Sequence, residues 1–192
     1  MAPDDPGLQF AVPVEPIPLA PVQVSFSSLT GRRAAERSGT VAALLELGLA
    51  DLPGVVPHVG NGPMSPSLAD ARSPSLDRWT LDVQVGTEPW QVSANLCTAD
   101  GRCRSHTSQQ GTPDAPTPAV AEVLRLVAET LDRSPSEAAL AAWSDPLPGD
   151  DYARLVAGRA AAAYYGLSEP IPEEHLGDAR RDPVLRAIRL NP

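Results

Sequence analysis

The chain has 192 residues, a formal net charge of −9 and fifteen basic residues, all of them arginine. This acidic balance argues against a nucleic-acid-binding surface, because phosphate contacts need clustered basic side chains. No apolar run approaches the ~20 residues that span a bilayer, and the first residues lack the basic and apolar parts of a secretory signal. We therefore expect a cytoplasmic chain without a membrane span.

The chain opens with a proline-rich stretch. Prolines recur throughout residues 1–21, and their spacing prevents both helix formation and strand pairing, so we expect an extended linker. Alternating apolar residues then predict a short strand over residues 22–26. Residues 27–31 are rich in turn-forming residues and predict a loop. The folded domain should therefore begin at residue 22.

A helix and a second strand are predicted next. An apolar stripe at helical spacing ends at Leu52, where Pro53 and Gly54 stop the helix. Residues 55–59 predict a short strand, which its central proline places at a sheet edge or a strand end. This strand–helix–strand unit predicts parallel pairing of its two strands. Residues 60–75 read as a loop and, like the linker, should be among the least ordered parts of the chain.

The most regular pattern is in the middle of the chain. Residues 79–85 and 90–96 alternate strictly between apolar and polar, as strands buried on one face do. Residues 102–109 predict a third strand that is polar on both faces, which suits a sheet edge. A helix with one apolar stripe follows, with Thr117 as the expected N-cap and Pro118 at its first position. We expect three antiparallel strands covered by this helix.

The two cysteines lie on either side of the turn between the second and third of these strands. A three-residue loop with Gly101 in the left-handed conformation places Cys97 opposite Cys103. A two-residue turn shifts the register and places Cys103 opposite Thr98. We expect Cys97 and Cys103 to be opposed, which satisfies the Cα separation of a disulfide. In a reducing cytoplasm the two side chains should nevertheless remain thiols.

Helices follow the antiparallel strands. Ser134 and Pro135 predict the start of a short helix that ends at Trp143. Residues 152–167 predict a longer, alanine-rich helix, and residues 183–190 a last short one.

These elements predict an α/β (α+β) fold. Residues 22–132 should form a mixed sheet of about five strands covered by two helices. Residues 1–21 are the linker before this domain, and residues 133–192 are a C-terminal helical extension.

The order of these elements and the residues within them resemble TolB amino-terminal-like domains. The stretches that carry the resemblance are residues 22–31, 53–56, 80–86, 90–101 and 119–131. Together they span residues 22–132, with Ser25 standing where the family usually has proline. The resemblance implies a binding or assembly module to which no catalytic residues are attached.

The end of the chain resembles a second family. Residues 182–192 resemble the end of a tetratricopeptide unit, and residues 152–165 resemble its first helix. A single unit cannot bury its own apolar faces, and about three are needed. Either the chain is part of a longer repeat protein, or these helices cap the α/β domain.

These observations predict a non-catalytic protein-interaction or regulatory module, the N-terminal part of a larger bacterial repeat-containing protein. Its partner is expected to be another protein or further repeats of the same chain. The tail, residues 182–192 with Leu185 and Ile188, is the expected principal contact surface. The edge of the polar third strand is a second expected surface. The alternative is a small-ligand-binding sensor domain that uses a cleft beside the sheet.

No residue is predicted to be catalytic or to bind a cofactor or a metal. Two cysteines without clustered histidines are too few for a structural zinc site, and His58, His106 and His175 fall in different predicted elements. Neither a glycine-rich phosphate loop nor a nucleophile elbow occurs. The Arg32 and Arg33 pair has acidic neighbours and is interpreted as part of a solvated face.

Overall fold

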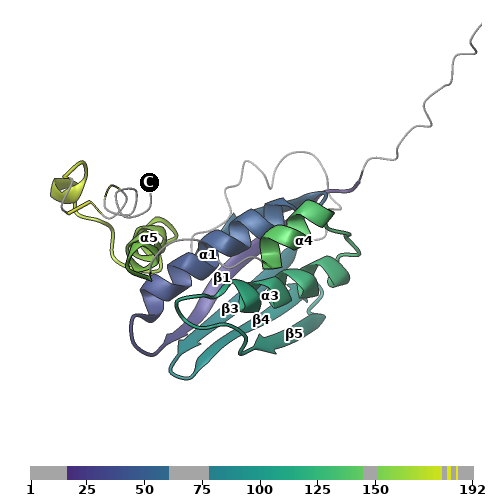
Figure 1. Ribbon diagram of the computed structural model, residues 1–192. Coiled ribbons are helices and arrows are strands. Elements are labelled where there is room, and N and C mark those ends of the chain that lie inside the picture. The colour runs from purple at the N-terminus through teal and green to yellow at the C-terminus, as the bar shows by residue number, and fades with distance from the viewer. Residues whose placement is uncertain (1–16, 61–77, 145–150, 179–180, 183–184, 186–192) are drawn as a thin grey trace, which may run out of the picture.

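A five-stranded mixed sheet with helices packed on one face forms the body of the protein (Figure 1). The computed structural model describes residues 17–60, 78–144, 151–178, 181–182 and 185. The strands are β1 (Ala20–Thr30), β2 (Val55–Val59), β3 (Trp79–Thr87), β4 (Trp90–Thr98) and β5 (Cys103–Ser108). They lie in the order β2-β1-β3-β4-β5, with β2 and β3 parallel to β1, and with β4 and β5 added antiparallel. The predicted α/β fold with five strands is confirmed.

Two helices cover one face of this sheet, as expected. Helices α1 (Ala34–Ala50) and α3 (Thr117–Thr130) lie beside each other over the sheet and run roughly along its strands in Figure 1. Helix α4 (Glu137–Ser144) packs against α3, and α5 (Asp151–Tyr164) packs against α1. A short 3-10 turn, Glu173–His175, follows.

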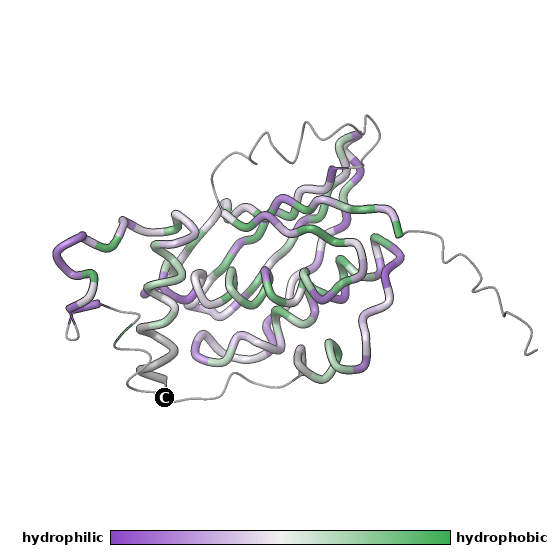
Figure 2. Tube along the Cα trace, turned by 90° about the horizontal axis from the view of Figure 1, so that it is seen from above, coloured by the Kyte–Doolittle hydropathy of each residue, from purple (hydrophilic) through white to green (hydrophobic). Residues whose placement is uncertain are grey.

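The core lies between the sheet and these two helices. Alternate side chains of β1, β3 and β4 point into it, because a strand turns successive residues to opposite faces. Its largest fully buried members are Val22, Val24, Val41, Leu45, Leu49, Leu52, Leu81, Val83, Val85, Val92, Leu96 and Leu124. Figure 2 shows hydrophobic positions along the strands and helices of this body and mostly hydrophilic positions in the chain beyond α5. Burial of each such side chain contributes roughly 1.5–3 kcal/mol.

Strand β1 is longer than its sequence pattern predicted. It continues to Thr30 through the serines that were interpreted as a loop, with a register shift between Phe26 and Ser28. The loop prediction was wrong for residues 27–30, because this part of β1 pairs with β3 and the pairing overrides the local turn preference of serine.

Two of the predicted helix starts were also wrong. Thr117 lies inside the first turn of α3, where its hydroxyl is buried, and Pro116 occupies the cap position without a side-chain bond. Helix α4 begins at Glu137, and its start is capped by Ser136, whose Oγ accepts a hydrogen bond from the Ala139 amide at 3.1 Å. Each flanking serine has the chemistry of a cap, so only the backbone path decides which one is used.

Helix α5 approaches α1 closely through small residues. A Cβ added at Gly39 would lie 2.2 Å from the carbonyl oxygen of Gly158, and Ala162 beside it is fully buried. The Tyr165 hydroxyl donates a hydrogen bond to the Glu46 carboxylate. The first part of the helical extension therefore packs on the α/β domain. The predicted last helix, the linker and the loop over 60–75 lie largely outside the described residues.

Candidate functional site

The sheet has two edge strands, β2 and β5. Strand β5 pairs only with β4 among the described strands, so its outer side is free. The turn between them is the predicted three-residue loop. Gly101 has φ +85°, and the amide of Thr98 donates to the carbonyl oxygen of Arg102 at 2.9 Å. Cys97 is therefore paired with Cys103, and the alternative register is excluded.

The backbone of alternate β5 residues points away from the sheet. In an antiparallel ladder, hydrogen-bonded pairs alternate with pairs that are not bonded. Because Thr98 and Arg102 form a bonded pair, Cys103, Ser105 and Thr107 fall at the non-bonded positions. The N–H and C=O groups of these three residues are directed outward, toward a place where another strand can pair.

All three of these residues are joined to β4 through their side chains. Cys103 forms a disulfide with Cys97, across a Cα separation of 4.1 Å. The Ser105 hydroxyl donates to Oδ1 of Asn95 at 2.9 Å, and the Thr107 and Ser93 hydroxyls are 3.0 Å apart. The expectation that the cysteines remain thiols is wrong for this structure, because non-bonded pairs bring opposed side chains closest together. These three links hold the edge strand in one register.

The sheet face opposite α1 and α3 is polar and nearly uncharged. No described helix covers this face, which is called the open face below. Among the residues that β1, β3, β4 and β5 contribute to it, only Asp82 carries a carboxylate. Asp82 accepts a hydrogen bond from the Ser27 hydroxyl at 2.7 Å. Its side chains come from Gln23, Ser25, Thr80, Asp82, Gln84, Gln91, Ser93, Asn95, Ser105 and Thr107. The edge of β5 is therefore bordered on this side by hydroxyl and amide groups.

On its other side β5 is tied to α3. Arg104 Nη1 donates to the Thr130 hydroxyl at 3.4 Å, and Nε2 of His106 lies 3.9 Å from a Glu122 oxygen. These contacts place the charged side chains of β5 toward the helix layer. The edge itself and the open face are left to small polar residues.

The structure keeps the three histidines apart, on β2, β5 and the turn that follows α5. Within the described residues no group of three or more His, Cys, Asp and Glu side chains is arranged to hold a metal ion. None of the described helices has the length and apolar character needed to cross a membrane. In the tail Leu185 is partly buried, and Ile188 lies outside the described residues.

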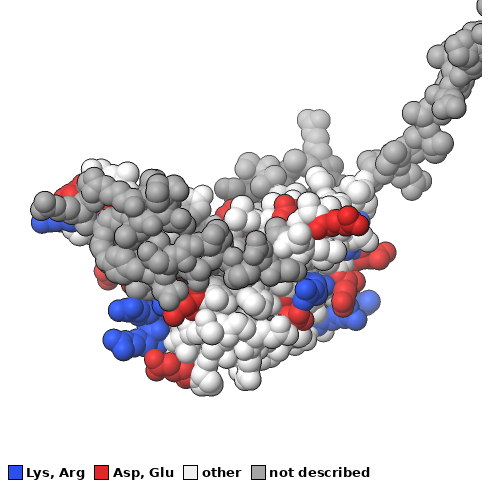
Figure 3. Space-filling model, in the orientation of Figure 1, with Lys and Arg blue, Asp and Glu red and all other residues white. Residues whose placement is uncertain are grey.

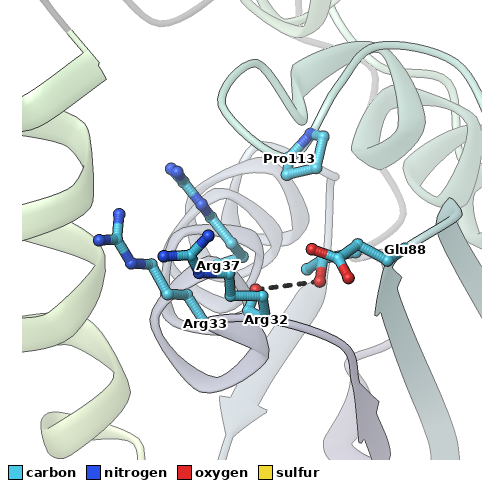
Figure 4. A pocket seen from close by; sticks show the side chains of 6 residues that line it. Arg32, Arg33, Arg37, Glu88 and Pro113 are labelled. Carbon is cyan, nitrogen blue, oxygen red and sulfur yellow. Dashed lines mark hydrogen bonds between the residues drawn. The ribbon is translucent and has the colours of Figure 1, made fainter.

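A pocket of about 250 Å³ lies at the start of α1, and three arginines line it (Figure 4). Arg32 and Arg33 come from the turn between β1 and α1, and Arg37 comes from the first turns of the helix. Glu88 faces them from the turn after β3. Sequence reasoning missed this cluster, because it treated Arg32 and Arg33 as solvated and had no means of placing Glu88 beside them. The one local signal was the arginine pair between a predicted loop and a predicted helix.

Comparisons with family models, with curated proteins and with solved structures found no match for this chain.

Proposed function

We propose that the chain is a non-catalytic protein-interaction module that accepts an extended segment of a partner protein along β5. The observation that carries the proposal is the free outer side of β5. Its outward N–H and C=O groups belong to Cys103, Ser105 and Thr107, whose side chains are linked to β4 on the open face. Strand addition draws its affinity from main-chain hydrogen bonds and its specificity from alternate side chains.

The ordering of β5 favours binding. A partner strand loses conformational freedom when it pairs, and a mobile edge would add its own ordering cost. The disulfide and the two side-chain hydrogen bonds reduce that second cost. Natural edge strands are usually protected by charges or proline, whereas Ser105 and Thr107, on the open face, are neutral and small.

The wider setting is part of the proposal. The resemblance to TolB amino-terminal-like domains followed by tetratricopeptide units suggests a regulatory or assembly role within a larger repeat-containing bacterial protein. The tail would then be a second contact surface, with further repeats packed against it. A nucleic-acid partner is not proposed, since the net charge is −9.

The test uses substitutions at one residue of the edge. Ser105→Pro removes an outward amide without removing a ladder hydrogen bond, and proline is tolerated at such edge positions. Ser105→Ala loses the bond to Asn95 but keeps the amide, so it is the matched control. Peptides selected on the wild-type protein from a displayed library of random extended sequences serve as the probe, and calorimetry measures their affinity.

We expect Ser105→Pro to weaken peptide binding by about tenfold or more, because at least one main-chain hydrogen bond is lost and its partner is left unpaired. Ser105→Ala should stay within about threefold of the wild type. Thermal melting checks that both variants are folded. Equal affinities of the folded proline variant and the wild type would rule out pairing at β5.

A further inference from the structure

The arginine pocket lies where the order of parallel strands reverses. The chain passes from β1 to β2 on one side of the sheet and then returns to β3 on the other side of β1. In open sheets, ligands bind at the carboxyl ends of the strands beside such a reversal. Here these ends are Thr30 and Thr87, and Thr87, Arg32 and Arg33 all line the pocket.

The backbone at this point is held in one conformation. The Thr87 hydroxyl, on a buried residue, donates to the carbonyl oxygen of Arg32 at 3.0 Å, the bond drawn in Figure 4. Gly31 has φ +97°, and a Cβ at this position would lie 2.3 Å from that same hydroxyl oxygen. The close approach of the two strand ends thus fixes where the arginine side chains emerge.

The arginines differ in how their charges are balanced. Arg37 is 12% exposed and forms an ion pair with Asp114. Arg32 and Arg33 are exposed, and neither forms an ion pair with another residue in the described part of the chain. Figure 3 shows arginine atoms projecting at the end of the molecule where α1 begins, beside acidic ones. Two guanidinium groups are therefore available to a ligand.

We propose that this pocket binds the phosphate group of a small phosphorylated molecule. A guanidinium group binds two oxygens of a phosphate through paired hydrogen bonds. Two guanidinium groups carry two positive charges, which match the two negative charges of a phosphate monoester and exceed the one charge of a carboxylate. The positive end of the α1 dipole favours the same charge. The pocket shares no residue with β5.

The volume and surroundings limit the size of the ligand. A pocket of about 250 Å³ is below the usual range for drug-sized molecules, so it holds a phosphate with a short organic part. A second hollow of about 670 Å³ shares Arg33 and extends to Ser168 and Glu169 after α5. The organic part would extend toward that hollow. Glu88 opposes the anion and lowers its affinity.

The test is calorimetry in phosphate-free buffer with inorganic phosphate, glycerol phosphate and acetate as probes. The double variant Arg32→Ala, Arg33→Gly removes both free guanidinium groups. Glycine is suited to position 33, where φ is +56°, so the turn should keep its shape. Arg102→Ala, Arg125→Ala is the matched control, because it removes the same charge from exposed positions on the β4–β5 turn and α3.

We expect the pocket variant to weaken binding of both phosphate probes by about tenfold or more, and the control to change it by less than about twofold. Glu88→Gln should bind phosphate more tightly than the wild type. The proposal fails if the wild type binds neither phosphate probe saturably, or if both double variants weaken binding equally. Acetate binding as tightly as phosphate would overturn the assignment of ligand class. A melting curve for each variant establishes that it is folded.

Discussion

Replacing Gly39 by alanine should weaken the packing of α5 on the α/β domain without unfolding that domain. Gly39 lies in the contact between α1 and α5, and its new Cβ would be 2.2 Å from the Gly158 oxygen and 2.4 Å from the Ala162 nitrogen. Contacts of this kind are essentially never shorter than 3.0 Å, and both neighbours are backbone atoms that no rotamer change can move. The two helices must therefore move apart by about 0.8 Å.

Two opposing terms set the result. An opening of 0.5–1 Å forfeits roughly a quarter to a half of the dispersion energy at a contact, and overpacking typically costs about 1–3 kcal/mol. This loss lowers the free energy with which α5 packs on α1, in a contact that includes the buried Ala162 and Tyr165. Within α1, alanine stabilises the helix by about 1 kcal/mol relative to glycine. We expect α5 to lose stability while the free energy of unfolding of the sheet domain is unchanged or slightly raised.

Native-state hydrogen exchange separates the two terms. Because α5 packs less stably on α1 in the variant, its amides should exchange about ten to a hundred times faster. Amides of β3 and β4 should keep their protection. In the comparison variant Gly48→Ala the new Cβ would lie 2.3 Å from Cδ1 of the Leu124 side chain of α3, away from α5, so the amides of α5 should keep their protection. Unchanged exchange in α5, or equal loss of protection in α5 and β4 of the Gly39 variant, would refute this reasoning.

Two further predictions concern other parts of the fold. Asp132 has φ +52° at the end of α3, where the amide of Arg133 donates to the Ala128 oxygen at 2.8 Å. Asp132→Gly should therefore raise the free energy of unfolding by about 1 kcal/mol. Urea titration of this variant, with Asp132→Ala as the control, checks this, and no gain over the wild type would contradict it. Burial, then the hydrogen bond to Glu46, raise the pKa of Tyr165, so the folded state keeps this proton to higher pH, and the stability that it contributes below pH ~10 is lost as the pH rises above that value. In a chain without lysine, the urea midpoint should therefore fall more between pH 9 and pH 11 for the wild type than for Tyr165→Phe, and equal falls would contradict the assignment.

The antiparallel half of the sheet was predictable because it depends on local patterns. Strands β3 and β4 alternate apolar and polar residues along their length, and burial on one face requires that period. The polar sequence of β5 and Pro57 in β2 indicated the two edges, since neither sequence suits the middle of a sheet. Gly101 predicted a turn at this position with either two or three residues in its loop, and the structure has the favoured three-residue loop, which pairs Cys97 with Cys103.

Other features depend on contacts between residues far apart in the chain, and only the tertiary structure decided them. The serines of β1 favour a turn locally, and pairing with β3 on one side makes them strand. The glycines at positions 39 and 158 are ordinary helix-weakening residues until α1 and α5 meet. The arginine pocket joins the turn before α1 to Glu88 and Pro113, more than 50 and about 80 residues later. Composition and periodicity report the faces of each element, but the order of strands in the sheet determines which side chains from separate elements share one pocket.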